Sequence, residues 1–173
     1  MRAPVELVPY RAEWPARFAE EAALLCTALS TWLVAAPEHI GSTAVPGLAA
    51  KPVIDIMAPV LTLAASRPAI QAAQRLGYCY APYKAHEMHW LCKPSPDLRT
   101  HHLHLVEHGG DLWRERLAFR DALRERAELM EEYGVLKHEL AALHPFDREA
   151  YTEGKSTFVR RAIDAHLGTG RGS

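Results

Sequence analysis

The sequence predicts a single α/β domain of the α+β type, in which a mixed β-sheet is flanked by helices and the C-terminal half is helical. Three observations lead to this fold class. Residues 53–58 form a short, β-branched apolar segment between two prolines, which is typical of a buried strand. Residues 102–105 alternate between polar and apolar side chains, as a half-buried strand does. From residue 111 onward, apolar positions recur at helical spacing.

The N-terminal part is expected to supply one short strand and one long helix. Residues 5–8 have strand character and end at Pro9. A helix begins at Trp14-Pro15, because proline fits the first turn of a helix, and Pro37 stops it. Its apolar stripe has helical spacing and consists of Phe18, Ala22, Leu25, Leu29 and Leu33. Residues 38–40 are then extended.

The rest of the chain is expected to contain a helix and two strands, followed by a region that is entirely helical. Residues 68–76 are a helix that Gly77 closes as its C-cap. Strands cover residues 87–92 and 101–106, with a proline-containing loop between them. Three further helices are expected at residues 111–125, 127–143 and about 147–167. There is no internal repeat or linker, so residues 1–167 form one domain, followed by a disordered tail at residues 168–173.

Composition argues for a cytoplasmic protein that does not bind nucleic acid. The formal net charge of the 173 residues is −1, whereas nucleic-acid-binding domains normally carry a strong basic excess. The three cysteines are odd in number and widely spaced, which is typical of reduced thiols in a cytosol. No apolar run is long enough to span a bilayer, and the N-terminus lacks the apolar core of a signal peptide. The oligomeric state is left open.

The segment from His39 to Ile56 carries the richest set of functional candidates. Gly41 would let a ligand approach the backbone closely, and Ser42 and Thr43 offer hydroxyl groups at a turn where backbone N–H groups favour an anion. Lys51 could add a positive charge. Asp55 interrupts an otherwise apolar strand and could hold a divalent metal. The structural alternative is a helix cap followed by a strand whose aspartate is hydrogen-bonded internally.

A histidine-rich strand forms the second candidate. Residues two apart on a strand face the same side, so His102 and His104 should point together while the leucines between them point into the core. Two convergent imidazoles can bind a metal or act as general acid and base. The alternative is that they lie on the solvent-facing side of an edge strand. Arg99, just before this strand, is a further candidate for neutralising an anion.

The helical half contributes cations whose function the sequence leaves open. Arg120 and Arg124 lie four residues apart and share a helix face, where an arginine fork could clamp a phosphate or a carboxylate. Most helix arginines are solvated or form surface ion pairs, and Lys137 and Lys155 carry the same alternative. We expect the four tryptophans to be core or lid residues rather than a base-stacking platform.

Several separated motifs resemble the GrpB-like family, a UPF0157-type branch of proteins with the nucleotidyltransferase fold. The stretch from His39 to Asp55 is similar to the signature of that family. The other similar motifs are Val8-Pro9-Tyr10, Glu13-Trp14, residues 100–107, residues 117–121, Leu123-Arg124, Tyr133, Leu136-Lys137, Tyr151 and Lys155. They occur in the same order from about Val5 to Ile163. The resemblance implies a mixed sheet with helices around it and a nucleotide-type pocket beside the Gly41-Ser42 turn.

The resemblance also implies an unusual reaction centre. Catalytic nucleotidyltransferases follow the Gly-Ser turn with two carboxylates one residue apart, which bind two Mg²⁺ together with a third carboxylate. Here Asp55 would be the first carboxylate, but Met57 stands at the second position and cannot bind Mg²⁺. His102 and His104 stand where the third carboxylate is expected. This departure, typical of the GrpB-like group, argues against ordinary two-metal nucleotidyl transfer.

Three functional hypotheses follow. The first is an enzyme that acts on a small anionic or nucleotide-like substrate, with one-metal nucleotidyl transfer as a possible reaction. Its metal would be a single divalent ion held by Asp55, His102 and His104, and nitrogen ligands favour Zn²⁺, Mn²⁺ or Fe²⁺ over Mg²⁺. The second is a metal-free acid/base catalyst, an isomerase or cyclase acting on a biosynthetic intermediate. The third is a non-catalytic ligand-binding or accessory module. Kinase activity of the P-loop type is not expected, because the sequence has no G-x-x-x-x-G-K-[ST] motif.

Overall fold

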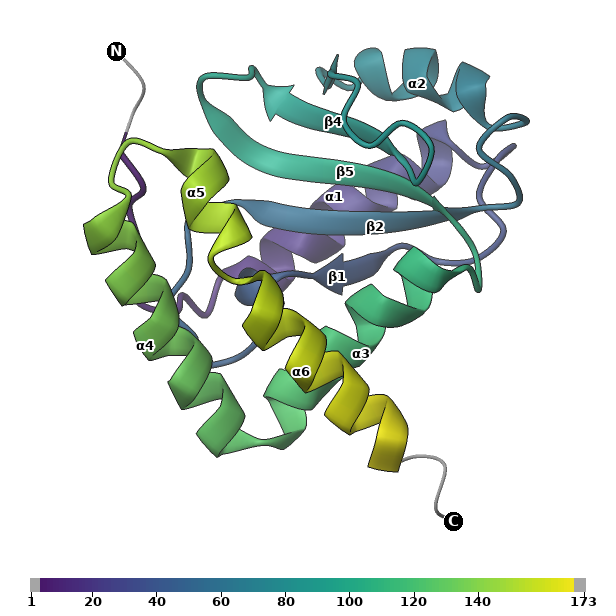
Figure 1. The fold of residues 1–173 in the computed structure, drawn as a ribbon. Helices are drawn as coiled ribbons and strands as arrows, with labels where there is room; N and C mark the ends of the chain where they lie inside the picture. The colour runs from purple at the N-terminus through teal and green to yellow at the C-terminus, as the bar shows by residue number, and fades with distance from the viewer. Residues whose placement is uncertain (1–3, 170–173) are drawn as a thin grey trace.

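The structure is a computed structural model that describes residues 4–169. A five-stranded sheet forms its centre, with helices on both faces (Figure 1). The strands are β1 (Glu38–Ile40), β2 (Ile54–Val60), β3 (Cys79–Tyr80), β4 (His89–Pro94) and β5 (Arg99–Glu107). The helices are α1 (Trp14–Ala28), α2 (Arg67–Gln74), α3 (Asp111–Glu125), α4 (Ala127–Leu143), α5 (Arg148–Glu153), α6 (Ser156–Thr169) and a 3-10 helix, η1 (Ser42–Ala44). The mixed sheet and the helical C-terminal half confirm the predicted fold class.

The order of the strands places the polar residues of two strands side by side. The order is β1-β2-β5-β4-β3, in which β2 and β5 are parallel and every other neighbouring pair is antiparallel. In the parallel pair, Asp55 is the register partner of His102, and Met57 is the partner of His104. Paired residues point to the same side of a sheet, so Asp55, His102 and His104 share one face. Because β5 is a central strand, the alternative of a solvent-facing edge strand is wrong.

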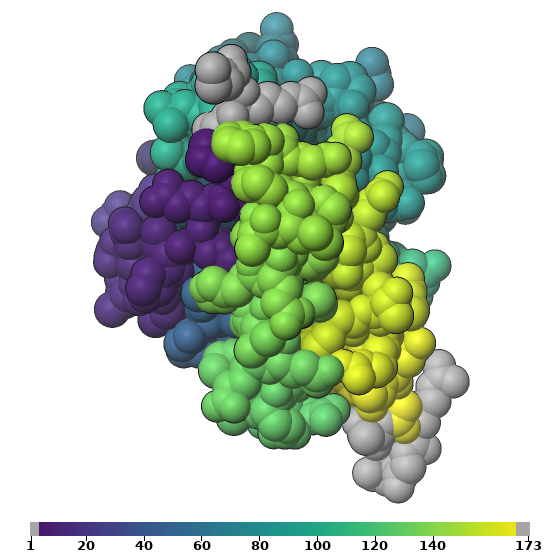
Figure 2. Space-filling model, turned by 60° about the vertical axis from the view of Figure 1, so that its left-hand side comes forward, coloured from purple at the N-terminus to yellow at the C-terminus, as the bar shows by residue number. Residues whose placement is uncertain are grey.

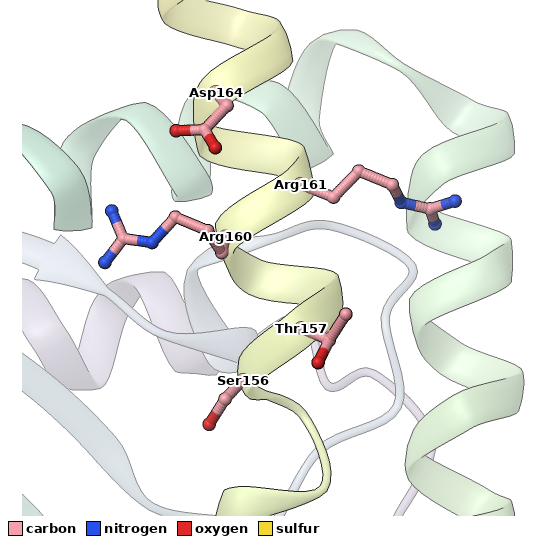
Figure 3. A pocket seen from close by; sticks show the side chains of 5 residues that line it. All are labelled: Ser156, Thr157, Arg160, Arg161 and Asp164. Atoms are coloured by element: carbon pink, nitrogen blue, oxygen red, sulfur yellow. The ribbon is translucent and has the colours of Figure 1, made fainter.

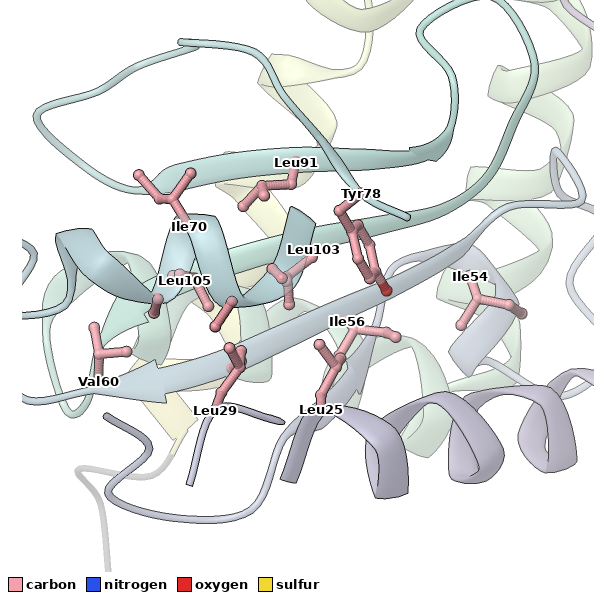
Figure 4. Packing of buried hydrophobic residues seen from close by; sticks show 14 of the residues in the cluster. Leu25, Leu29, Ile54, Ile56, Val60, Ile70, Tyr78, Leu91, Leu103 and Leu105 are labelled. Atoms are coloured by element: carbon pink, nitrogen blue, oxygen red, sulfur yellow. The ribbon is translucent and has the colours of Figure 1, made fainter. Parts of the chain in front are cut away.

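The other face of the sheet is covered by α1 and α2. Apolar side chains of β2, among them Ile54 and Ile56, pack against Leu25 of α1 and against Leu29, which directly follows this helix, and α2 adds Ile70 (Figure 4). These positions alternate with Asp55 and Met57 along β2, which is why the short apolar strand could carry an aspartate without disturbing this core. The dry packing of this face makes β2 and β5 a rigid support for the polar side chains on the opposite face.

The polar face is covered only in part by the C-terminal helices. Near α3, Met57, Met88 and Val106 form a small apolar cluster with Trp113. A second cluster joins α3, α4 and α6 to the segment after η1, and includes Tyr133 and Phe158. The two clusters hold α4, α5 and α6 around the polar face.

The N-terminal segment differs from the prediction. Residues 5–8 do not form a strand of the sheet: Val8 makes an isolated bridge to Ala50, and the N–H of Val5 donates to the carbonyl oxygen of Pro145 at 2.8 Å. The segment therefore lies against the end of α4, as the neighbouring dark purple and green surfaces show (Figure 2). The helix that begins at Trp14 also ends earlier than expected, because Leu33 leaves it to bridge Val60.

The predicted third C-terminal helix is two helices. α5 ends at Glu153 and α6 begins at Ser156, with Gly154 and Lys155 between them. A Cβ at Gly154 would lie 2.5 Å from Leu140 Cδ2, so the break rests on close packing against α4. α6 continues to Thr169, two residues into the expected tail, and residues 170–173 lie outside the described residues. None of the helices within residues 4–169 is long and apolar enough to cross a membrane.

The strands also differ in detail from their expected bounds. β4 and β5 extend to Pro94 and back to Arg99, so the connecting loop is shorter than predicted. The short strand β3 was not predicted, because two residues carry too little pattern to be recognised. His101 shares the face of Leu103, where burial lowers its pKa beside the ion pair of Lys93 with Glu21.

Candidate functional site

A cavity of about 820 Å³ opens over the polar face, between the sheet and the helices α4 and α5. Its floor is formed by Asp55 of β2 and His102 of β5, and Ser42 and Thr43 of η1 line its side. The cationic side chains around it are Lys51, Arg99, Arg116, Lys137, Arg148 and Lys155. Its volume is within the range of small-molecule sites.

Asp55 and His102 line this cavity, and the buried His104 lies next to them. The Nδ1 atom of His102 lies 2.9 Å from Asp55 Oδ1, and the Nε2 atom of His104 lies 3.3 Å from the same oxygen. The possible ligand atoms of all three residues lie within 4.8 Å of one another. His104 is buried and the Asp55 side chain is 27% exposed, so the cluster is reached from the cavity side. The structure therefore brings together the three residues that the sequence singled out.

The charges within this cluster are coupled. Burial alone would raise the pKa of Asp55, but the charge of His102 and the hydrogen bonds from both imidazoles outweigh burial and hold this pKa well below its ordinary value. Burial lowers the pKa of His104, which favours the neutral imidazole. Asp55 is thus an anion, and His104 is a neutral ring whose nitrogen can serve as a metal ligand.

The donor set fits a single divalent transition metal. One carboxylate oxygen and two imidazole nitrogens are a common set of protein ligands for a catalytic metal, and a further coordination position would face the cavity. If His104 bound a metal through Nε2, its Nδ1–H would be oriented by Met88 Sδ, which lies 3.4 Å away. The Nε2 atom of His102 is buried and has no hydrogen-bond partner within the described part of the chain.

The turn at Gly41 brings the backbone against Asp55. Gly41 has φ +74°, and a Cβ at this position would lie 2.7 Å from Asp55 Oδ2. In the structure, the group that lies close to the backbone of Gly41 is the carboxylate of Asp55, whereas the sequence suggested a ligand in this position. Thr43 lines the cavity, but its hydroxyl is engaged by His39 Nε2 at 3.0 Å, and burial lowers the pKa of His39 to about 4. Ser42 is the residue of the turn whose hydroxyl faces the cationic side of the cavity.

Three lysines from different parts of the chain line the cavity. The Nζ atoms of Lys51 and Lys155 each lie 4.3 Å from the ring centroid of Tyr151. Lys137 is buried and donates hydrogen bonds to Ser42 Oγ at 2.9 Å and to the carbonyl oxygen of Ala49. Burial, and then the charges of neighbouring cations, lower the pKa of Lys51 and of Lys155 to about 8 and that of Lys137 to about 7.

The lining of the cavity contains six cationic side chains and four carboxylates, which are Asp55, Asp97, Glu149 and Glu153. None of these three lysines forms an ion pair with a carboxylate within residues 4–168. Ionisable side chains whose pKa values are shifted by burial and by neighbouring charges are common at functional sites. Lys51 and Lys155 were predicted as substrate-binding residues, whereas Lys137 was considered a solvated helix residue rather than part of the site.

The arginines divide into two groups. Arg99 lines the cavity, stacks on Trp90 with its guanidinium carbon 5.1 Å from the ring centroid, and donates to the carbonyl oxygen of Pro96. Arg116 and Arg148 also line the cavity and were missed, because single arginines on helices are usually solvated.

Arg120, which was expected to bind substrate, does not line the cavity. It donates to Glu38 Oε2 at 2.6 Å and to Asp121 Oδ1 at 2.8 Å, so its charge is neutralised by two carboxylates. These contacts fasten α3 to β1. The prediction failed because the fork shape that suits a phosphate suits the protein's own carboxylates equally well.

A shallow hollow on the outer side of α6 is a poorer candidate. It is lined by Ser156, Thr157, Arg160, Arg161 and Asp164 (Figure 3). Arg160 forms an ion pair with Glu115, and Arg161 forms one with Glu132, so its two cations already have acidic partners. All five residues come from one helix, and the hollow contains no cluster of chemically reactive groups.

Comparison with known proteins places the chain in a family. A family model described as GrpB protein matches residues 4–165. The UPF0157 protein YqkA of Bacillus subtilis is 33% identical over 158 residues, which are 91% of this chain but 46% of that protein. A UPF0157 protein of Pseudomonas aeruginosa is 37% identical over 174 residues, covering 96% of this chain and 69% of that protein.

A solved structure supports the same assignment. The crystal structure of conserved protein GrpB from Enterococcus faecalis matches with a TM-score of 0.85 at 33% identity, covering 95% of this chain and 98% of that chain. This chain thus spans about half the length of the Bacillus subtilis relative and nearly all of the Enterococcus faecalis structure. From the family match, the relatives and this shared fold, the chain belongs to the GrpB family.

Proposed function

We propose that the protein is an enzyme that acts on a small anionic, nucleotide-like substrate, with Asp55, His102 and His104 holding one divalent metal at the reaction centre. One observation carries the proposal. The possible ligand atoms of the three residues lie within 4.8 Å of one another, and two of these residues, Asp55 and His102, line a cavity that is also lined by three lysines without an ion-pair partner in the described residues. A reaction centre and an anion site therefore face the same space.

Several residues that line the cavity would bind the substrate, each in a different role. Lys51 and Lys155 would neutralise the negative charge of the substrate, and Ser42 would donate a hydrogen bond to one of its oxygens. Arg99 on the opposite side would bind a second charged group or the leaving portion. Because the lysines are partly desolvated, their attraction to an anion is stronger than that of surface lysines.

The metal would be held by the carboxylate of Asp55 and one nitrogen of each histidine. Nitrogen ligands favour Zn²⁺, Mn²⁺ or Fe²⁺ over Mg²⁺. Such a metal would supply Lewis-acid activation of a phosphoryl oxygen, as in a one-metal nucleotidyl transfer. Met57 is fully buried among Ile40, Val106 and Trp113, so the position of a second metal-binding carboxylate in nucleotidyltransferases is filled by core packing here.

A second function is favoured by a specific observation. His102 directs Nδ1 to Asp55, while its Nε2 atom is buried and has no partner within the described residues. A carboxylate that holds one nitrogen of an imidazole leaves the other nitrogen free to move a proton, as in acid/base catalysis. The same cavity could therefore catalyse an isomerisation or cyclisation of an anionic intermediate without a metal.

One experiment separates these functions. Purified protein is incubated with a panel of nucleotides and phosphorylated metabolites, with Mn²⁺ or Zn²⁺ and in parallel with excess chelator, and products are followed by mass spectrometry. Turnover that requires metal and is lost in Asp55→Asn supports the metal enzyme. Turnover that survives chelator but is lost in His102→Ala supports acid/base catalysis. His138→Ala, an exposed histidine away from the cavity, is the matched control.

The third hypothesis gives a different outcome. Tight binding of a panel member without turnover under any condition would contradict both catalytic functions and leave a ligand-binding module.

A further inference from the structure

The pairing of Ser42 with a buried lysine is not used by the proposed reaction centre. Lys137 is 2% exposed, its Nζ atom lies 2.9 Å from Ser42 Oγ, and both residues line the cavity. Burial of an ammonium group without an acidic partner is costly, so such a lysine needs a reason to be there. Its contacts are the serine hydroxyl, the carbonyl oxygen of Ala49 and the face of the Tyr133 ring, 5.0 Å from its centroid.

The surroundings of Lys137 favour its neutral amine. The charged groups that face it are Lys51 and Lys155, both cations, and the ionisable groups beside it also include the phenol of Tyr133. Burial and these two cations lower the pKa of Lys137 to about 7, whereas burial raises the pKa of Tyr133 and keeps its phenol neutral. A neutral amine has a lone pair, and a lysine held in this state can accept a proton.

We propose that Ser42 is a nucleophile and Lys137 is its general base, and that together they transfer a phosphoryl group from an anionic substrate to the serine oxygen. The proposal rests on the 2.9 Å separation of Lys137 Nζ from Ser42 Oγ, on the burial of Lys137 and on the cavity that both residues line. A phosphoryl group is the electrophile that suits the site, because Lys51 and Lys155 line the same cavity as the serine and would neutralise the oxygens of the group under attack.

The step balances without any other reagent. As Ser42 Oγ bonds to phosphorus, its proton moves to Lys137 Nζ, and the bond from phosphorus to the leaving oxygen breaks with its electron pair on that oxygen. The Lys137 ammonium can return the proton to the leaving group. Water then attacks phosphorus, the bond to Ser42 Oγ breaks, and the serine regains a proton. Tyr133, which also forms a hydrogen bond with Ser42, would hold the hydroxyl in position.

This inference goes beyond the proposed function and can fail separately from it. The Asp55–histidine cluster is judged by its metal content and turnover, whereas the serine–lysine pair is judged by covalent labelling of the apo protein. A metal centre with an inert Ser42, or a reactive Ser42 without a metal, are both distinguishable results.

The test is labelling with a small alkyl fluorophosphonate, in which Ser42 Oγ would bond to phosphorus and fluoride would leave. We expect one adduct per chain by intact mass, located on Ser42 by peptide mapping and lost in Ser42→Ala. Its rate should rise with pH through the range in which Lys137 loses its proton. Ser156→Ala, in the hollow on α6, is the matched control and should label as the wild type does. Absence of an adduct on Ser42 in the wild type would overturn the proposal.

Lys137→Arg separates a base from a positioning residue. Arginine keeps a cation and a donor near Ser42 but stays protonated, so it cannot accept the serine proton. A general base predicts a loss of labelling rate of about 10²–10⁴-fold in Lys137→Arg and in Lys137→Met. Wild-type labelling in Lys137→Arg would show that Lys137 only positions the serine. If either variant fails to fold by circular dichroism, the pH profile of the wild type still decides, since a rate without an inflection near neutrality contradicts the base.

Discussion

Replacing Lys137 by methionine should change how the stability of the protein depends on pH. Methionine fills a similar volume without a charge, so the variant removes one titrating group from the space beneath Ser42. The variant also removes the donor to Ser42 and to the carbonyl oxygen of Ala49, which should cost about 1–3 kcal/mol at every pH. That loss is a constant offset, so the pH dependence alone reports the lysine.

The size of the effect follows from the shift in pKa. In the folded chain the pKa of Lys137 is lowered from 10.5 to about 7, so between these values the unfolded chain binds more protons than the folded chain. The free energy of unfolding of the wild type therefore rises as pH increases through this range. At 1.36 kcal/mol per pKa unit, the penalty for burying the ammonium falls by about 2–3 kcal/mol between pH 6 and pH 9. Lys137→Met has no such penalty.

Urea denaturation of both proteins at a series of pH values measures the effect. Lys51 and Lys155 titrate in the wild type and in the variant, so the difference between the two curves isolates Lys137 and its coupling to them. As the pH falls from 9 to 6, the free energy of unfolding of the variant should increase by about 2–3 kcal/mol relative to that of the wild type. Parallel curves would refute the reasoning, because they would mean that Lys137 keeps an ordinary pKa in the folded state.

Three other predictions concern single positions. Gly41→Ala should lose about 1–3 kcal/mol more stability in urea than Gly77→Ala, because both glycines have positive φ but only the first would place a Cβ against Asp55; equal losses would deny the close contact. Arg120→Met should lower the free energy of unfolding by about 2–4 kcal/mol, while its affinity for inorganic pyrophosphate, measured by calorimetry, should equal that of the wild type. Weaker pyrophosphate binding by this variant would mean that Arg120 does bind the ligand. Inorganic pyrophosphate should raise the melting temperature of the wild type but not of Lys155→Met, and an equal rise in both would remove this lysine from the anion site.

The elements that sequence pattern could predict are those decided by local chemistry. The buried strand at residues 53–58 was visible because β-branched residues between prolines specify a strand regardless of the rest of the chain. The shared face of His102 and His104 followed from the alternation of side chains along a strand. The bounds of α3 and α4 matched the prediction because Gly110 and Pro145 punctuate long periodic segments.

The features that sequence pattern could not predict depend on contacts between distant parts of the chain. Nothing local says that β5 pairs in parallel with β2, and that pairing is what brings His102 to Asp55. The break between α5 and α6 depends on how closely Gly154 packs against Leu140, and it carries Lys155 into the cavity.

The burial of Lys137 could not be predicted for the same reason. It follows a run of helix residues with acidic neighbours, and lysines on such helices are usually solvated. Its burial is a property of tertiary packing, since α4 must lie against the Gly41-Ser42 turn before the side chain can reach Ser42. Arg120 is the opposite case, because this arginine was expected to bind substrate but forms ion pairs with Glu38 and Asp121 instead.

The central claim is that Asp55, His102 and His104 form a metal centre, and elemental analysis of purified, tag-free protein tests it most directly. The wild type is compared with His102→Ala/His104→Ala, and with His86→Ala/His138→Ala as a control pair of exposed histidines. We predict about one transition metal per chain in the wild type and in the control, and none in the His102/His104 variant. The absence of metal from the wild type, even after incubation with excess Mn²⁺ or Zn²⁺, would contradict the claim.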